Sequence, residues 1–308
     1  MNLNRKIQLE QQGEEIQLVV DCDGVIKKYV PLFRKSNIHY SSDYPIPSHK
    51  SNNIPTFTYI RAREYLERRN LFMPTLKEIA ELLVLFCKMD KGEVDDKMSD
   101  FLRDYLGFSP KGMIRSQYWK EDLHHLTNFF TDHGFLLGET GVYIQDNPPI
   151  KKELCESFLL EDIEERYDPD SFLIGLQSVE NRRIDMNECV LRDKIKTEEG
   201  GIFYSEDKTV RFVPYKNIVP GVQNQLEIEE NTLVIATVGR DGARTLGRIP
   251  RDIGVRCFLP EDYHWRFHKG KPGVVQIHGY MAYVEEKLDV TINFNGGGIV
   301  GKALGRVR

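Results

Sequence analysis

The chain has no long apolar run. None of its hydrophobic stretches approaches the roughly 18 to 20 residues that a membrane-spanning helix needs, and Met1–Lys6 leads into charged sequence instead of the apolar core of a signal peptide. These absences argue against a helical membrane protein and against a secreted one. We therefore expect a soluble, cytoplasmic protein without a membrane partner.

Net positive charge is also missing. The 308 residues include 42 Lys and Arg against 47 Asp and Glu, which gives a formal net charge of -5. Charges of both signs are mixed along the chain, so no overall field attracts it to nucleic acid or to an anionic membrane. Nucleic-acid binding would need a local basic patch and is not the favoured function.

Closely spaced cysteines are absent. The five cysteines are odd in number, and no two of them form a Cys-x-x-Cys pair; they are Cys22, Cys87, Cys155, Cys189 and Cys257. This spacing argues against a zinc knuckle and against the disulfide frame of a small secreted domain. We expect buried thiols and no bound cofactor.

What the chain does have is enough apolar sequence for a large core, with 40% hydrophobic residues. The clearest local signal is a capping box, in which Thr75 and Glu78 precede apolar residues at helical spacing. A helix is expected to begin there, within a helical block that covers residues 58–134. Further helices are expected at Lys97–Leu106 and Trp119–Thr131.

After Gly134 the pattern changes to strands and turns. Phe135–Ile144 is typical of a hairpin. The other expected strands are Ile16–Val20, Ile202–Tyr204, Thr209–Val213, Thr232–Val238, Gly254–Leu259, Val274–His278 and Tyr283–Phe294. Together with the helical block, they predict an α+β fold with mainly antiparallel strands.

Two distant segments carry a resemblance to a known family. The first, Tyr59–Glu78, contains the turn Met-Pro-Thr-Leu-Lys-Glu. The second is the expected strand pair Leu233–Val238 and Ile253–Phe258, joined by the arginine-rich segment Gly239–Asp252, and it includes Gly-Val-Arg-Cys. In order and spacing these segments resemble the C-type-lectin-like fold of the formylglycine-generating enzyme and sulfatase-modifying-factor superfamily.

The resemblance implies a lectin-like domain over residues 1–260 and a β-rich extension over residues 261–308. The oxidase branch of this superfamily uses a pair of close cysteines as copper ligands, but no cysteine lies between Cys189 and Cys257. The Gly-Asn-Val-Trp-Glu-Trp signature is missing as well. We therefore expect a non-catalytic binding protein on a lectin-like scaffold.

The candidate binding residues are arginines that fall within 17 positions of one another; they are Arg240, Arg244, Arg248, Arg251 and Arg256. Guanidinium groups at this density suit a carboxylate or phosphate ligand. A structural role is the alternative, in which Arg240 and Arg251 pair with the neighbouring Asp241 and Asp252, and Arg256 pairs with a core carboxylate or with backbone carbonyls. The expected partner is an anionic ligand or a protein.

A second class of function rests on Asp21 and Asp23. The sequence around them resembles the first motif of haloacid-dehalogenase-type phosphatases, in which one Asp attacks phosphorus, the second moves protons and Mg²⁺ neutralises charge. No downstream Gly-Asp-x-x-x-Asp segment accompanies it. The alternative is an Asp-Gly turn that closes a hairpin. A parallel strand ending at Asp21 would favour the phosphatase, and an antiparallel one the turn.

Three histidines are weak candidates for a metal site. His264 and His268 are four residues apart, and His278 follows ten residues later. Two histidines at this spacing lie close together on a helix, but the flanking Pro260 and glycines favour turns. A surface pair of histidines is the favoured interpretation.

Overall fold

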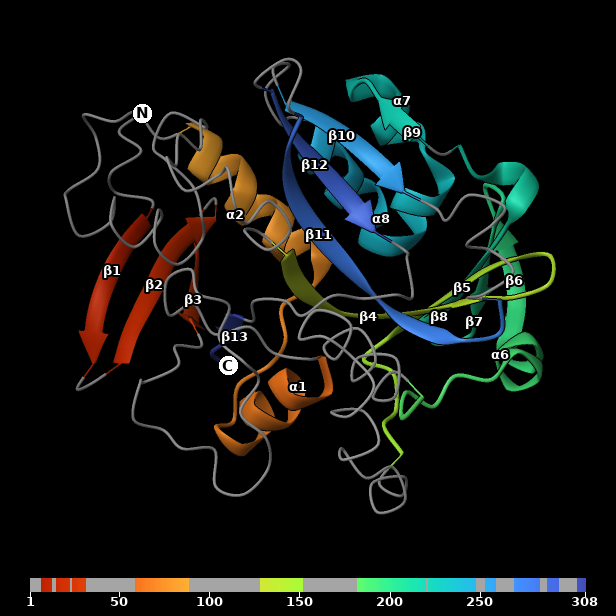
Figure 1. Ribbon diagram of the computed structural model, residues 1–308, viewed down its shortest axis with the longest axis horizontal. Coiled ribbons are helices and arrows are strands. Elements are labelled where there is room, and N and C mark those ends of the chain that lie inside the picture. The colour runs from red at the N-terminus through yellow and green to blue at the C-terminus, as the bar shows by residue number, and fades with distance from the viewer. Residues whose placement is uncertain are drawn as a thin grey trace, which may run out of the picture.

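The computed structural model describes residues 7–12, 15–22, 24–31, 59–88, 128–151, 182–219, 221–247, 253–258, 269–282, 287–293 and 304–308. Within these residues the fold is α+β, as the sequence predicted. Two sheets lie side by side, with helices between and beside them (Figure 1). The described helices are α1 (Tyr59–Arg68), α2 (Leu76–Lys88), α6 (Glu188–Lys194), α7 (Gln225–Glu230) and α8 (Thr232–Gly247).

The smaller sheet joins the two ends of the chain. Its order is β1-β2-β3-β13, and every neighbouring pair is antiparallel. These strands are β1 (Ile7–Gln12), β2 (Glu15–Cys22), β3 (Val25–Pro31) and β13 (Leu304–Arg306).

The larger sheet has nine strands in the order β6-β7-β8-β5-β4-β11-β12-β10-β9. Its neighbours are antiparallel except β10 and β12, which run parallel. The strands are β4 (Asn128–Leu137), β5 (Gly141–Asp146), β6 (Ile195–Glu199), β7 (Ile202–Ser205), β8 (Val210–Pro214), β9 (Gly221–Gln223), β10 (Ile253–Phe258), β11 (Pro272–Ala282) and β12 (Lys287–Asn293). The expected Phe135–Ile144 hairpin is confirmed, because β4 pairs with β5.

The predicted capping box starts α2. The Thr75 hydroxyl accepts the Glu78 N–H at 3.1 Å, and the Glu78 carboxylate accepts the Thr75 N–H at 3.0 Å. This reciprocal pair satisfies two backbone groups that have no partner inside the helix. The same device, formed by Asn224 and Glu227, starts α7.

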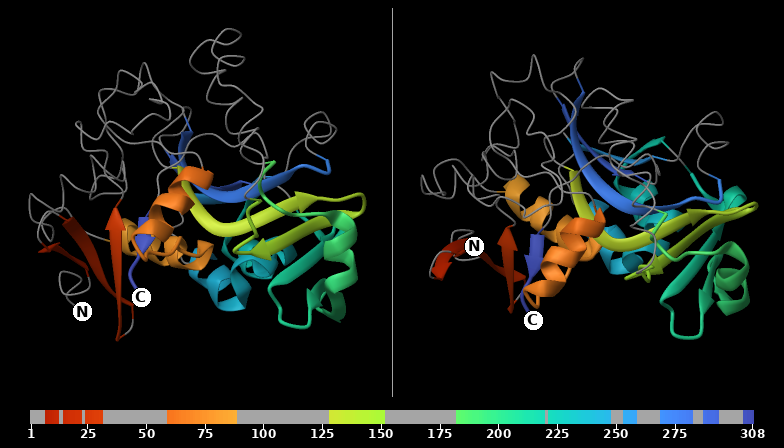
Figure 2. Two further views of the ribbon diagram at one scale, coloured as in Figure 1. Left: turned by 90° about the horizontal axis from the view of Figure 1, so that it is seen from below. Right: turned by 60° about the horizontal axis from the view of Figure 1, so that its bottom comes forward.

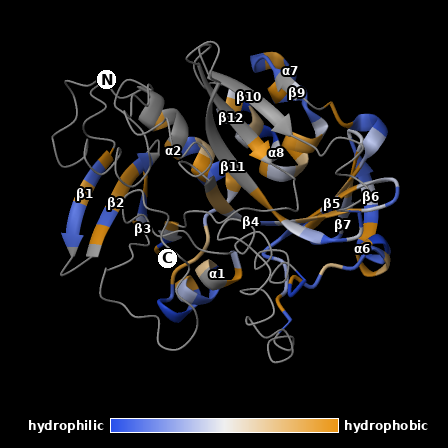
Figure 3. Ribbon diagram, in the orientation of Figure 1, coloured by the Kyte–Doolittle hydropathy of each residue, from blue (hydrophilic) through white to orange (hydrophobic). Residues whose placement is uncertain are grey.

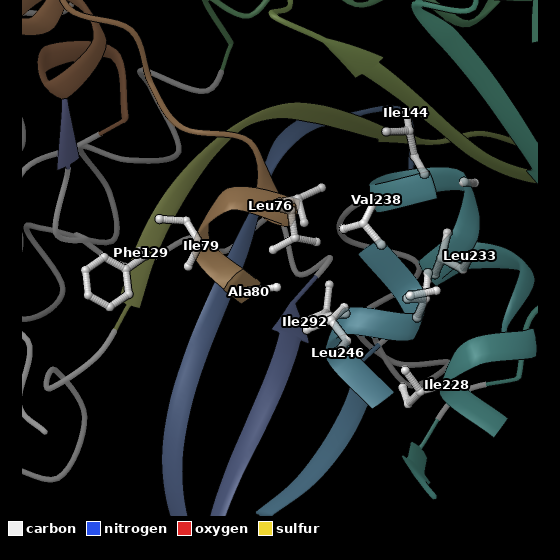
Figure 4. Packing of buried hydrophobic residues seen from close by; sticks show 14 of the residues in the cluster. Leu76, Ile79, Ala80, Phe129, Ile144, Ile228, Leu233, Val238, Leu246 and Ile292 are labelled. Carbon is white, nitrogen blue, oxygen red and sulfur yellow. The ribbon is translucent and has the colours of Figure 1, made fainter. Parts of the chain in front are cut away.

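Helices α2, α7 and α8 lie along one face of the nine-stranded sheet (Figure 2). The core between them contains Leu76 and Ile79 from α2, Leu233 and Leu246 from α8, and Ile292 from β12 (Figure 4). The hydropathy colouring follows this arrangement, since α8 is largely hydrophobic while the edge strand β6 is largely hydrophilic (Figure 3). Burial of these side chains is the main force that holds the helices on the sheet.

One expected strand is a helix. Thr232–Val238 forms the first part of α8, so the strand pair with Ile253–Phe258 does not exist, although the latter is strand β10. The β-branched residues favour a strand, but the Asn231 side chain accepts the N–H groups of Leu233 and Val234 and caps a helix. Packing on the sheet stabilises this helix and overrides the local preference.

The helical block also ends earlier than expected. Residues 128–134 belong to strand β4, so neither the block over 58–134 nor the helix Trp119–Thr131 extends as predicted. The expected helix Lys97–Leu106 lies outside the described residues. In the part of the chain that is described, no helix is both long and apolar enough to span a membrane.

The strands after residue 260 do not form an appendage. β11 and β12 lie in the interior of the nine-stranded sheet, between β4 and β10, and β13 completes the smaller sheet. A boundary at residue 260 would separate β11 and β12 from their neighbours in the larger sheet, β4 and β10. Residues 261–308 are β-rich where they are described, as expected, but they complete the two sheets instead of extending past them.

Leu233→Ala tests the packing of α8. Leu233 is fully buried, so we expect the variant to lose about 2–5 kcal/mol of unfolding free energy in urea denaturation. The matched control is Leu226→Ala on the neighbouring helix α7, where the side chain is 69% exposed. The control should change stability by less than about 0.5 kcal/mol. Equal losses would contradict the burial of this face of α8.

Candidate anion-binding site

Helix α8 consists of two helical segments that meet at Gly239. Gly239 has φ 73° and ψ 170°, which is not helical, and helical geometry resumes at Arg240. This combination of angles is essentially restricted to glycine. A Cβ at this position would meet no atom within 4 Å, so the backbone angles alone, and not space, require glycine here. The result is a bend at the exposed Gly239, after which the chain is helical again and reaches the buried Gly242; residues 239–242 are called the Gly239–Gly242 turn below.

Close packing fixes the other end of this turn. A Cβ on Gly242 would lie 2.6 Å from the Cβ of Val238, far closer than two carbon atoms can approach. The same Cβ would lie 3.4 Å from the Cγ of Lys77 on α2. The stem of the Lys77 side chain therefore lies beside the buried Gly242, where α2 and α8 pack together.

Two arginines extend from the second segment of α8. Arg240 and Arg244 are both exposed and are one helical turn apart, on one side of the helix. The only acid in the turn is Asp241, which pairs with Arg244 at 3.3 Å. Both partners of this pair are largely exposed, so it stabilises the fold little and an anionic ligand can replace it.

Arg240 lies against the edge of the nine-stranded sheet. A Cβ on Gly200 would lie 3.4 Å from Nη2 of Arg240, which places the guanidinium group against the turn between β6 and β7. Partial burial and the Glu199 carboxylate raise the pKa of Tyr204 on β7, while nearby arginines, Arg240 among them, lower it. The Nζ of Lys208 lies 5.7 Å from the centre of the Tyr204 ring.

We name the two exposed arginines Arg240 and Arg244 the basic surface. Both lie on the second segment of α8, and sequence reasoning had already found both. The Gly-x-x-Gly spacing was the one local signal that could have located the turn.

The other three predicted arginines do not contribute a described side chain to this site. Arg248 and Arg251 lie outside the described residues. Arg256 lies on β10, opposite Val222 of β9 and Thr291 of β12, and its side chain is not described. The binding site proposed from the sequence is thus reduced to Arg240 and Arg244.

Asp21 lies at the end of an antiparallel strand. β2 and β3 pair with Asp21 opposite Ile26, and the Asp21 carboxylate accepts the Gly24 N–H at 2.7 Å. Gly24 has φ 89°, as an Asp-Gly hairpin turn requires. Asp23 lies outside the described residues. This geometry matches the turn interpretation, and the parallel strand that a phosphatase nucleophile needs is not formed here.

The metal candidates also gain no support. His264 and His268 lie outside the described residues, and His278 is known only by its backbone position on β11, opposite Asn128 and Thr291. Over the described ranges, no three His, Cys, Asp or Glu side chains are grouped so that they could hold a metal ion. Cys189, expected to be a buried thiol, is instead free and exposed.

A buried polar cluster holds α2 on the sheet. His133 accepts the Leu76 N–H through Nε2 at 3.3 Å, and its Nδ1 lies 2.8 Å from the Asp146 carboxylate. Arg211 donates two hydrogen bonds to the same carboxylate. Both ring nitrogens of His133 are therefore occupied, with the proton on Nδ1, so the ring is a helix cap and not an available acid or base.

The pKa values of the two aspartates in this cluster are shifted in opposite directions. Burial disfavours the charge of Asp146, but hydrogen bonds from His133 and Arg211 outweigh it and lower the pKa of Asp146. Burial raises the pKa of Asp132, despite the nearby His133. The Oδ1 atom of Asp132 is buried without a hydrogen-bond partner. The cluster is thus structural, and the burial of the Asp132 carboxylate within it costs stability.

The basic surface remains the best candidate site in the described part of the chain. Comparison with protein-family models, with curated proteins and with solved structures finds no match to this chain.

The aspartate cluster predicts a pH dependence of stability. The pKa of Asp146 is lowered in the folded state, so its contribution is complete above the ordinary value of 3.8 and is lost as pH falls through the lower value. The pKa of Asp132 is raised, so ionisation of Asp132 costs stability as pH rises above 3.8. We expect Asp146→Asn to lose about 1–3 kcal/mol at pH 7 in urea denaturation.

The matched control is Asp132→Asn, which should keep or increase stability at pH 7 because it removes a buried charge. The two variants should also differ in acid titrations of stability, since Asp146→Asn flattens the loss of stability below pH 4. A loss in Asp132→Asn as large as that in Asp146→Asn would contradict the opposite pKa shifts.

The backbone of the turn gives a further prediction. Gly239→Ala should lower the unfolding free energy by about 1–3 kcal/mol, because alanine is strained at these angles. Arg240→Ala, at the next and equally exposed position, should change it by less than about 0.5 kcal/mol. Thermal and urea denaturation measure both. A stable Gly239→Ala variant would show that the second segment of α8 does not need this conformation.

Proposed function

We propose that this protein is a non-catalytic binding protein that holds an anionic ligand at the Gly239–Gly242 turn. Arg240 and Arg244 donate charged hydrogen bonds to the ligand. The observation that carries the proposal is the pair of exposed guanidinium groups, one helical turn apart, that follows the exposed Gly239 at the start of the second segment of α8.

The chemistry of the turn suits an oxyanion. The first N–H groups of a helix have no intrahelical partner, and the helix dipole makes this end positive. Two guanidinium groups on one side of the same helix add planar donors that match carboxylate or phosphate oxygens. A net charge of -5 does not oppose this, because screening confines the effect of distant charges to about 8–10 Å.

The lectin-like scaffold remains a separate proposal. The segment Tyr59–Glu78 has the expected arrangement, in which two helices are joined by the Met-Pro-Thr turn. The second segment of the resemblance does not form the expected strand pair, because Leu233–Val238 is helical. The binding role depends on the basic surface and does not depend on the scaffold.

Charge reversal tests the site. We expect Arg240→Glu to elute from immobilised heparin at clearly lower salt than the unchanged protein, and to bind inorganic polyphosphate at least about tenfold more weakly, because a donor becomes a repelling charge. Lys151→Glu is the matched control. It makes the same change in net charge at an exposed residue, paired with Asp185, that is not part of the basic surface.

An equal effect of the two variants would mean that only net charge matters, and the site would be wrong. Circular dichroism spectra that match those of the unchanged protein are required of both variants. Since both positions are exposed, neither change should disturb the fold.

A further inference from the structure

We infer that the end of helix α1 and strand β13 together bind an acidic segment of another protein, one that also carries an apolar side chain. We name the side chains concerned the arginine–phenylalanine surface; they are Arg68, Arg69, Phe72, Arg306 and Arg308. This inference goes beyond the proposed function, because the two arginines of that site lie on α8.

Backbone contacts join the two parts of this surface. Phe72 and Arg306 exchange two backbone hydrogen bonds, of 3.0 and 2.8 Å, so their side chains are neighbours. A Cβ on Gly305 would lie 2.6 Å from Cδ2 of Leu66 and 2.7 Å from Cδ1 of Leu71. β13 therefore packs directly against the end of α1, and the two lie side by side (Figure 1).

Phe72 is an exposed aromatic residue with arginines over its ring. The side chain belongs to the large hydrophobic residues that stay exposed, at 37%. The Cζ atoms of Arg306 and Arg308 lie 5.8 and 4.8 Å from the centre of this ring. Arg69 lies over the ring of Tyr65 in the same way, at 5.5 Å. A guanidinium group that already stacks on a ring loses less freedom when it binds a carboxylate.

Positive charge is in excess here. Arg68 and Arg308 are exposed, and neither forms an ion pair with a carboxylate among the residues that the structure describes. The carboxylates of the segment 59–78 already have cation partners; the pairs are Glu64–Arg183, Glu67–Arg63 and Glu78–Arg306. The surface is thus locally cationic on a chain whose net charge is -5, and it attracts an acidic partner.

The combination of groups favours a peptide over a nucleic acid. Guanidinium groups bind carboxylates through two parallel hydrogen bonds, and clusters of arginines are a recurring way to recognise acidic segments. Two guanidinium groups already lie over the Phe72 ring, so a flat base has less access to its faces than an aliphatic side chain has to its edge. The exposed ring therefore selects an acidic segment with an apolar residue.

The experiment is fluorescence anisotropy of the full chain with labelled peptides. The main probe alternates Glu and Leu over roughly ten residues, about 33 Å when extended. A peptide of alternating Glu and Ser has the same charge without apolar side chains, and one of alternating Lys and Leu has the opposite charge. Single-stranded RNA with the same number of charges is the nucleic-acid probe.

We expect the Glu-Leu peptide to bind most tightly, with an affinity that falls as salt is added, and the Lys-Leu peptide not to bind. Arg308→Glu should weaken binding of both acidic peptides at least about tenfold, and Arg68→Gln about threefold. Lys151→Glu, which makes the same change in net charge as Arg308→Glu at another exposed position, is the matched control and should leave binding unchanged.

Phe72 separates the apolar contact from the charged ones. Phe72→Ala should weaken binding of the Glu-Leu peptide about fivefold and leave binding of the Glu-Ser peptide unchanged. Arg306 is kept in all variants, because its loss would leave the Glu78 carboxylate, only 6% exposed, without its closest cation. Urea denaturation shows which variants are folded, and Arg308→Glu tests the surface even if Phe72→Ala is not.

The outcomes also separate this inference from the proposed function. Arg240→Glu should not affect peptide binding, and loss of binding in that variant would place the peptide on the basic surface and overturn the inference. Equal effects of Arg308→Glu and Lys151→Glu would mean that only net charge matters. Tighter binding of RNA than of either acidic peptide, or no peptide binding up to about 1 mM, would likewise overturn the inference.

Discussion

The packing of α8 against both α2 and the nine-stranded sheet is the constraint from which the basic surface follows. Leu233 and Leu246, one from each segment of α8, belong to the same core as Leu76 of α2. Both segments must therefore stay on the sheet, and the change of direction between them is absorbed at Gly239, whose backbone is free to adopt it. Because the turn projects from a packed helix, its arginines lie on a rigid base.

Gly242 shows how closely the second segment of α8 folds back on the first. A Cβ at residue 242 would lie 2.6 Å from the Cβ of Val238 in the same helix, whereas the Cγ of Lys77 on α2 would lie 3.4 Å away, an ordinary contact distance. Glycine at residue 242 is therefore required by the bend of α8 itself, and the stem of Lys77 packs beside it.

Stability elsewhere relies on a different kind of contact. His133, Asp146 and Arg211 connect the start of α2 to β4, β5 and β8 through charged hydrogen bonds in a mostly buried position. Such a cluster stabilises the fold most when every buried polar atom has a hydrogen-bond partner. The Oδ1 atom of Asp132 is buried and has none. α2 is therefore held by apolar packing on one side and by this polar cluster at its first residue, and both fix the position of Lys77.

Local sequence determined the elements whose signals lie within a few residues: the capping box of Thr75 and Glu78, the Asp-Gly hairpin before β3, and most of the strands. These signals are hydrogen bonds and turn conformations between near neighbours, so no distant contact is needed to interpret them. Tertiary structure decided that Leu233–Val238 is a helix, that β11 and β12 complete the larger sheet, and that Arg240 lies against the turn between β6 and β7. These outcomes depend on burial against residues far away in the chain, which β-branched composition and charge spacing do not reveal.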